Sequence, residues 1–229
     1  NQMNVDLDKD EFVCIFARSD AYLKQTIPHI NFGYHDTRCS DIDSLIEATK
    51  YLIEKGFKVI RIGSIVNKPI NFSHEKLTDY PYSKNQSDFL DIFLLAYCKL
   101  VISAGPSGIT DVATLFDCPI LAVNVAENWY APLLKNSLYT PKKYKYCNTN
   151  NYLRFQEGIK LGAFWKDLKT HGLETEEASP QEILEATEEM MARLEGEFKY
   201  SPESERLIQA YQKVWREAGV IGHKTQTPV

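Results

Sequence analysis

The chain has 229 residues, of which 44% are hydrophobic and 25% charged, and its formal net charge at pH 7 is −5. This length predicts one large domain or two small ones, and the composition excludes a disordered, collagenous or coiled-coil chain. The acidic balance argues against a general nucleic-acid-binding protein. The most apolar stretch, residues 89–104, contains Asp91 and Lys99, so no transmembrane segment is predicted.

The five cysteines include no pair with CxxC spacing. A disulfide framework and a zinc site are therefore not predicted, and a reducing compartment fits best. No secretory signal is recognisable. We expect the protein in the cytoplasm, with a place at the inner membrane surface left open. Because the chain begins with Asn1 rather than methionine, we also expect a processed chain or a fragment.

The first half of the chain alternates between predicted strands and helices. The apolar run Phe12–Ala17 (FVCIFA) predicts a buried strand, and a polar loop follows it. Ser40 is predicted to cap a helix that ends at Gly56. Residues 58–62 (KVIRI) predict a second strand, and the polar residues 66–86 predict a loop.

The next elements repeat this alternation. Ser87 is predicted to cap a helix over residues 88–99, which is apolar on nearly every face and therefore expected to be deeply buried. Residues 100–104 predict a third strand, and a tight turn leads into a helix that ends near Asp117. Residues 120–125 predict a fourth strand.

This order of elements predicts an α/β fold: a Rossmann-like parallel sheet with helices on both faces, followed by a helical tail. Residues 126–175 read as irregular or as short helices. Ser179 and Glu182 form a capping box for a helix over 180–194, and a last helix is predicted over 202–218. The expected organisation has four parts: a leader (1–11), a Rossmann-like lobe (12–175), helices packed on that lobe (176–219) and a disordered tail (220–229).

Ligands of open parallel sheets bind at the carboxyl ends of the strands, so the residues that follow each strand are the candidate site. The turn at residues 103–108 (SAGPSG) leads from the third strand into a helix. Its small residues let an anion approach the backbone, and the helix N-terminus supplies N–H groups and partial positive charge. Ser103, Gly105, Ser107 and Gly108 are therefore candidate phosphate-binding residues, although a plain tight turn gives the same pattern.

Three arginines lie at or near these strand ends. Arg18 follows the first strand and is expected to clamp a diphosphate, unless it pairs with Asp20. Arg61 falls inside a strand and needs a partner there, either a carboxylate or a ligand phosphate. Arg38 precedes the first helix and could reach the same site.

Other groups have more ordinary interpretations. Asp41 and Asp43 have the DxD spacing of a metal site, but their place in a first turn favours helix capping. No metal site is therefore predicted. A lysine group interleaved with tyrosines reads either as a contact for an anionic acceptor or membrane surface, or as a solvated loop; its members are Lys142, Lys143 and Lys145. Trp129 and Tyr130 could stack on a base or sugar, or pack in the core.

Several of these motifs together resemble a family of bacterial glycosyltransferases from surface-carbohydrate loci, which have the two-lobed GT-B architecture. Residues 87–124 carry the most specific part of the resemblance. Five other stretches match in order: FARSDAYL (16–23), RCSDI (38–42), KVIRIGS (58–64), and the closing segments at 152–165 and 179–196. The resemblance covers about residues 12–198, mainly the donor-binding carboxyl-terminal lobe.

The resemblance implies transfer of a sugar from a UDP- or GDP-sugar to a glycan or lipid-linked hydroxyl acceptor, with no tightly bound cofactor. Ser107 and Gly108 would hold the donor diphosphate, and Arg18 would be a second clamp. Asp20 is the acid we nominate for catalysis. Since a two-lobed enzyme needs roughly 350 residues, an amino-terminal lobe or a partner chain is expected in addition.

Two other interpretations stay open. The first is a nucleotide-sugar epimerase of the same superfold, because Ser107 and Gly108 with Asp111 loosely resemble its serine-glycine-acid turn. The second is a non-enzymatic binding module in which Arg18 and Arg61 pair with internal carboxylates.

Overall fold

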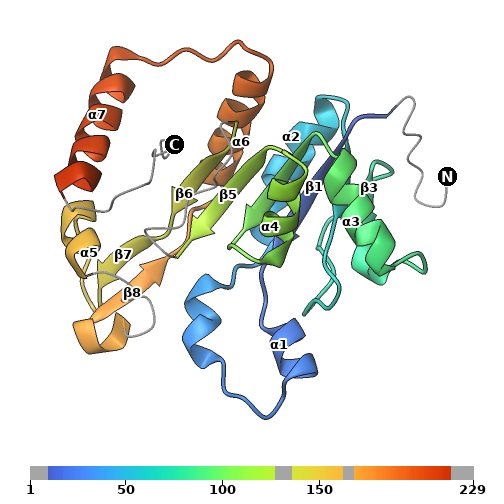
Figure 1. Ribbon diagram of the computed structural model, residues 1–229, viewed down its shortest axis with the longest axis horizontal. Coiled ribbons are helices and arrows are strands. Elements are labelled where there is room, and N and C mark those ends of the chain that lie inside the picture. Colours follow the sequence, from blue (N-terminus) through green and yellow to red (C-terminus); the bar gives the residue numbers. More distant parts are fainter. Residues whose placement is uncertain (1–9, 127–135, 162–167, 218–229) are drawn as a thin grey trace.

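The structure is a computed structural model that describes residues 10–126, 136–161 and 168–217. Its centre is a six-stranded sheet with the order β3-β2-β1-β4-β5-β6, in which every neighbouring pair is parallel (Figure 1). The strands are β1 (Phe12–Ala17), β2 (Lys58–Arg61), β3 (Leu77–Asp79), β4 (Leu100–Ala104), β5 (Ile120–Val125) and β6 (Leu138–Pro141). This is the doubly wound order, whose switch point lies between β1 and β4. The predicted α/β class is confirmed.

The α-helices of the described chain are α1 (Ala21–Thr26), α2 (Ile46–Glu54), α3 (Asp88–Tyr97), α4 (Gly108–Leu115), α5 (Phe155–Leu161), α6 (Pro180–Leu194) and α7 (Pro202–Glu217). Short 3₁₀ helices occupy Gly33–Arg38, Ile42–Leu45, Tyr80–Tyr82 and Leu168–His171. A separate antiparallel pair joins β7 (Lys143–Tyr146) to β8 (Leu173–Glu176).

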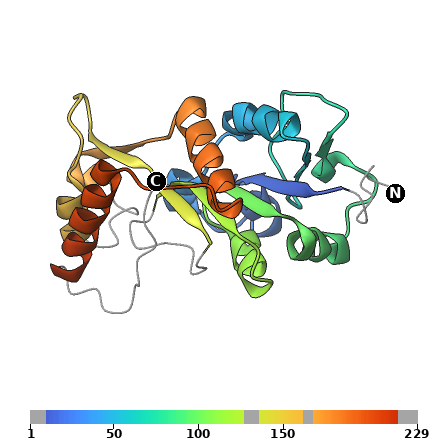
Figure 2. The same cartoon turned by 90° about the horizontal axis from the view of Figure 1, so that it is seen from above.

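Helices cover both faces of the sheet, as predicted: α2 and α6 lie on one face, and α3 and α4 on the other (Figure 2). The strands are buried from both sides. In β1, Val13 and Ile15 belong to the core beneath α2 and α6, whereas Phe12 and Cys14 belong to the core on the opposite face. Burial on both faces explains why the central strands read as continuous apolar runs in the sequence.

The segments predicted as polar loops contain secondary-structure elements that were not predicted. The predicted loop at 66–86 contains β3, a strand of three residues that pairs with β2. The polar loop after β1 contains α1, none of whose residues is buried. Both elements are short and half-exposed, so neither has the apolar periodicity on which the prediction depends.

Helix α3 corrects the prediction of deep burial. Leu94 and Leu95 are buried against the sheet, but Phe89 is 74% exposed and Tyr97 is 65% exposed. On the neighbouring α4, Leu115 is 81% exposed. The helix buries one face only. A helix with apolar residues on every face can be buried on all sides, but the sequence does not show that other parts of the protein bury it.

The start of the α2 region corrects the predicted cap. Asp41, not Ser40, provides it: the Asp41 carboxylate accepts a hydrogen bond from the N–H of Asp43 at 3.0 Å. A 3₁₀ turn over Ile42–Leu45 then precedes α2. The Nζ atom of Lys68 lies 2.7 Å from a carboxylate oxygen of each aspartate. The capping interpretation is thereby confirmed for Asp41, whereas Asp43 lies in the first turn and accepts from the N–H of Asn71 at 2.8 Å.

The segment from 126 to 175 is more regular than predicted, since it contains β6, β7 and β8. The lysines that read as a solvated loop are paired with carboxylates. Lys142, whose side chain is 2% exposed, lies 3.0 Å from Glu177, and Lys143 lies 2.5 Å from Glu182. Lys142 and Lys143 therefore pair with carboxylates from a segment much later in the chain. This pairing could not be foreseen because it joins residues 35 or more positions apart.

Some predictions fall outside the described residues: Trp129, Tyr130, most of the leader, and the tail from 220 onward. Within the described ranges, no helix has both the length and the apolar character needed to cross a membrane.

Candidate functional site

The turns after β1 and β4 meet at the switch point of the sheet. The backbone N–H of Arg18 donates to the carbonyl of Ala104 at 2.8 Å, which continues the β1–β4 ladder one residue beyond the strand. From this point the strand order runs in opposite directions, from β1 to β2 on one side and from β4 to β5 on the other. In doubly wound sheets this divergence opens the crevice where ligands bind.

The β4–α4 turn is shaped from inside by two of the predicted residues. Ser103 is fully buried, and its hydroxyl donates to the carbonyl of Gly105 at 2.9 Å. Gly105 has a φ of +86°, and the carbonyl of Arg38 packs where a side chain would be. The structure therefore places Ser103 and Gly105 behind the turn, as its supports.

Ser107 and Gly108 lie on the outer side of the same turn. Ser107 is the N-cap of α4: its hydroxyl accepts from the N–H of Ile109 at 3.3 Å, and its own N–H donates to Thr110 Oγ1 at 3.4 Å. Apart from its chain neighbours and the backbone of its own helix, no described heavy atom comes within 4 Å of the position that a Cβ on Gly108 would take. The positive end of the helix is therefore capped but accessible, as an anion site requires.

A cavity of about 400 Å³ opens in front of this helix end. Its polar side is formed by Arg18, Ser19, Ser107 and Gly108, with the β2 turn at Gly63 and Ser64 beside them. Its apolar wall is formed by Phe16, Tyr22, Leu23, Ile65 and Ile109. The size lies within the range of about 300–1,000 Å³ that small-molecule sites occupy, and the mixture suits a ligand with one flat apolar part and one anionic part.

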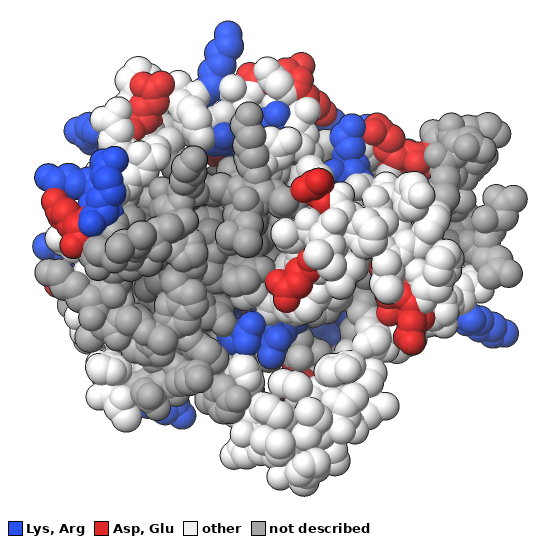
Figure 3. All heavy atoms as spheres, viewed as in Figure 1, with Lys and Arg blue, Asp and Glu red and all other residues white. Residues whose placement is uncertain are grey.

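Arg18 and Arg38 converge on the β4–α4 turn. The carbonyl of Pro106 accepts from Arg18 at 3.5 Å and from Arg38 at 3.2 Å. The space-filling view shows Lys and Arg atoms in the hollow between the α4 region and the α1 segment (Figure 3). The structure thus brings together two of the three arginines that the sequence singled out, next to the candidate phosphate loop.

The third arginine has a different partner. Arg61 is buried, and its NH1 atom lies 3.0 and 3.1 Å from the two carboxylate oxygens of Asp79 on β3. Asp79 also accepts from the N–H of Ile70 at 3.0 Å. Of the two predicted partners, a carboxylate or a ligand phosphate, the structure supplies the carboxylate. Arg61 therefore joins two strands at the edge of the sheet.

Asp20, the carboxylate nominated for catalysis, is the N-cap residue of α1. Lys24 forms an ion pair with its carboxylate, and the amide of Asn67 donates to it at 3.0 Å. These two contacts, that of Lys24 first, hold the pKa of Asp20 below its ordinary value of 3.8. At neutral pH the group is ionised, which is the form a base needs, but the lowered pKa makes it a weak base.

Sequence reasoning missed the apolar wall of the cavity. Tyr22, Ile65 and Ile109 follow three different strands, and single apolar residues in turns carry no motif. It also missed Gln86, whose amide donates to the carbonyls of Gly63 at 3.0 Å and Ser64 at 2.8 Å and so fixes the β2 turn. For Tyr22, Ile65 and Ile109, the only available signal was that each comes soon after a strand.

No protein-family model matches the chain, and no curated protein matches its sequence. One solved structure with some likeness is the dodecameric iron-containing heptosyltransferase TibC in complex with ADP-D-beta-D-heptose, with a TM-score of 0.40 and 12% identity. The match covers 83% of this chain and 49% of that one, so the chain spans about half the length of the heptosyltransferase. At 12% identity no functional residue is transferred from one protein to the other.

Proposed function

We propose that the chain binds a nucleotide sugar at the β1–β4 switch point and is the donor-binding lobe of a glycosyltransferase. The observation that carries this proposal is the cavity that Arg18 and the capped N-terminus of α4 line together, with apolar side chains along its other wall. The diphosphate would lie against Arg18, Ser107 and Gly108. The nucleoside would lie along Tyr22, Ile65 and Ile109, which offer the flat apolar contacts that a base requires.

The chemistry assigned to this lobe is stabilisation of the leaving group. In sugar transfer, the acceptor oxygen forms a bond to the anomeric carbon while the bond from that carbon to the diphosphate breaks. The electron pair of that bond and the resulting negative charge stay with the nucleoside diphosphate. A guanidinium and the N–H groups of a helix end are fixed donors aimed at that charge, which is the arrangement that lowers such a barrier most.

The acceptor side of the reaction requires a base to take the proton of the attacking hydroxyl. The ionised carboxylate of Asp20 is a weak base because Lys24 and Asn67 lower its pKa. We therefore propose that an acceptor-binding lobe, either elsewhere in the same protein or on a partner chain, supplies the base and holds the glycan or lipid-linked acceptor.

Thermal unfolding with UDP, GDP and their sugar conjugates tests donor binding. A ligand at 100 times its Kd stabilises the folded state by about 2.7 kcal/mol, which raises the Tm of a chain this long by roughly 5–10 °C. Arg18→Gln should weaken binding about tenfold or more, because a hydrogen bond to a charged group contributes about 1.5–3 kcal/mol.

The matched control is Arg206→Gln, which removes the same charge from an exposed position on α7 and should leave the ligand-induced shift unchanged. If no nucleotide or nucleotide sugar shifts the Tm, or if Arg18→Gln and Arg206→Gln behave alike, the proposed donor site is wrong. Incubation with the donor alone then separates transfer from epimerisation, because an epimerase converts the sugar without any acceptor.

A further inference from the structure

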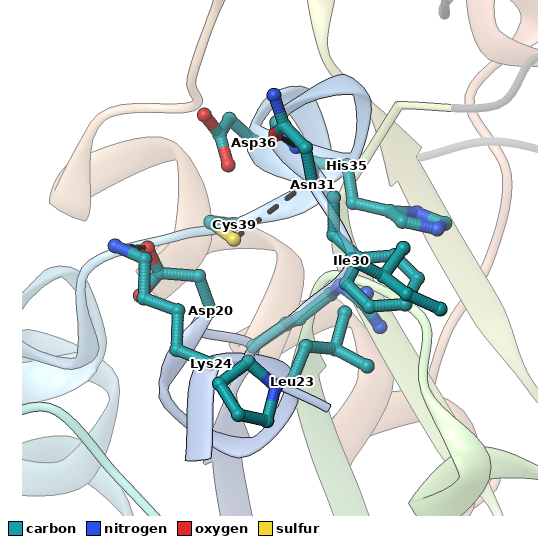
Figure 4. Close-up of a pocket in the computed structure, with 12 residues that line it drawn as sticks. Asp20, Leu23, Lys24, Ile30, Asn31, His35, Asp36 and Cys39 are labelled. Atoms are coloured by element: carbon teal, nitrogen blue, oxygen red, sulfur yellow. Dashed lines mark hydrogen bonds and ion pairs between the residues drawn. The ribbon is translucent and has the colours of Figure 1, made fainter. Parts of the chain in front are cut away.

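A second cavity, of about 320 Å³, lies on the other side of Arg18 and Leu23, which line both cavities. It is enclosed by α1, the loop that follows it, and the 3₁₀ helix at Gly33–Arg38 (Figure 4). The two cavities therefore meet at the guanidinium-bearing residue that the proposed function assigns to the diphosphate.

The walls of this second cavity carry many hydrogen-bonding groups of both kinds. Asp20 and Asp36 supply carboxylate acceptors, Lys24 supplies donors, and Asn31 supplies an amide. Figure 4 shows these side chains around the space beside Cys39. The remaining wall is apolar and is formed by Leu23, Pro28, Ile30 and Phe32.

This lining selects among ligand classes. Arg18 and Lys24 balance the charges of the two carboxylates, so the lining does not favour an anion, and six polar side chains disfavour a purely apolar ligand. A sugar ring has hydroxyl groups that both donate and accept, together with C–H faces that pack on apolar surface. It is the class of ligand that uses both kinds of wall at once.

The hydrogen-bonding groups are held in place by neighbours. The side-chain oxygen of Asn31 accepts from the N–H of Gly33 at 2.9 Å, so its NH₂ group points away from that contact and can donate to a ligand. Arg38 contacts Nδ1 of His35 at 3.1 Å and the carbonyl of Pro106 at 3.2 Å. Because arginine only donates, Nδ1 of His35 accepts and its proton is on Nε2. Arg38 thereby ties the 3₁₀ helix to the β4–α4 turn.

We propose that the second cavity holds the sugar ring of the donor, with Asn31 and Asp36 as the side chains that select its hydroxyl pattern. This inference rests on the proposed function, since Arg18 must place the diphosphate between the two cavities. It assigns the nucleoside and the sugar to opposite sides of one arginine.

Calorimetric titration of UDP, GDP, UDP-glucose, UDP-N-acetylglucosamine, GDP-mannose and GDP-fucose tests the assignment. Asn31→Ala and Asp36→Ala should each weaken the best-binding nucleotide sugar about three- to tenfold, the value of one or two hydrogen bonds. The affinity for the matching nucleoside diphosphate should change less than twofold, which also shows that the variants are folded. Glu75→Ala removes an exposed carboxylate elsewhere and should change neither affinity.

The outcomes separate the two proposals. If nucleoside diphosphates bind but Asn31→Ala and Asp36→Ala leave the preference for the sugar conjugate unchanged, the sugar subsite is wrong and the donor site stands. If neither the diphosphates nor their sugar conjugates bind the unaltered protein, both proposals fall together.

Discussion

The carbonyl oxygen of Arg38 occupies the space into which a side chain on Gly105 would project. Gly105 also has a φ of +86°, a conformation that residues with a Cβ adopt at a cost. The contact fixes the distance between the 3₁₀ helix at Gly33–Arg38 and the β4–α4 turn. Since these two segments form the walls of the two cavities, the absence of a Cβ at position 105 sets the geometry of the site.

Gly105→Ala should therefore destabilise the fold by at least about 2 kcal/mol, from the unfavourable φ and the displaced Arg38 backbone. Gly108→Ala is the control, because open space surrounds the position of its Cβ within the described chain. It should change the free energy of unfolding by less than about 1 kcal/mol. Urea denaturation of both variants measures the difference. Equal effects would show that Arg38 yields to a side chain at position 105.

The Arg61–Asp79 pair gives a second prediction. The two side chains are 4% and 21% exposed, so Arg61→Met leaves a largely buried carboxylate without its cation. This should cost about 3–5 kcal/mol in unfolding free energy. The double variant Arg61→Met/Asp79→Leu should regain part of the loss, but not all, because Asp79 also accepts from the N–H of Ile70.

The exposed pair between Lys99 and Glu11 is the comparison for this measurement. Its side chains are 42% and 64% exposed, so Lys99→Met should cost less than about 1 kcal/mol. If Arg61→Met lowers the unfolding free energy no more than Lys99→Met does, Arg61 is not needed to join β2 to β3.

The ionisation of Asp20 is a third prediction. Its pKa lies below 3.8 in the folded protein, chiefly because of the hydrogen bond from Lys24 and then that from Asn67. A lowered pKa contributes stability above the unfolded-state value, and that contribution is lost as the pH falls through the folded-state pKa. In an NMR titration, Lys24→Met should raise the pKa of Asp20 toward 3.8, whereas Lys213→Met on α7 should not. Titration of Asp20 near neutral pH would contradict these contacts and would make its carboxylate a stronger candidate for the catalytic base.

The difference between buried and exposed leucines on α3 and α4 gives a fourth prediction. Leu115 is 81% exposed and Leu94 is 1% exposed. Leu94→Ala should cost about 2–5 kcal/mol through the cavity it leaves, and Leu115→Ala less than about 0.5 kcal/mol. Thermal unfolding distinguishes them. A large effect at Leu115 would show that a neighbouring segment covers it.

Buried strands were the part of the fold that the sequence predicted best. Phe12–Ala17, Leu100–Ala104 and Ile120–Val125 have the predicted bounds, because a strand covered on both faces is apolar throughout and polar residues mark its ends. The strand Leu77–Asp79 was not predicted. Three half-exposed residues have no strand pattern of their own, and they form a strand because they pair with the edge of β2.

Some residues of the candidate site could likewise be predicted from the sequence, and others could not. Arg18 and the turn containing Ser107 and Gly108 could be selected because each follows a predicted strand, and topology then brings them together. The partner of Arg61 could not be selected, since Asp79 lies on a strand that the sequence did not reveal. The second cavity depends on the path of a 3₁₀ helix, which leaves no periodic pattern in the sequence.

Backbone amide NMR during titration with UDP or GDP tests the central claim most directly. We predict saturable shifts of the Ser107, Gly108 and Ile109 amides, with smaller shifts at Arg18 and Ser19 and none around Arg193, which lines a separate cavity of about 250 Å³. Shifts centred on Arg193 and absent from α4, or none at millimolar nucleotide, would contradict a nucleotide site at the switch point.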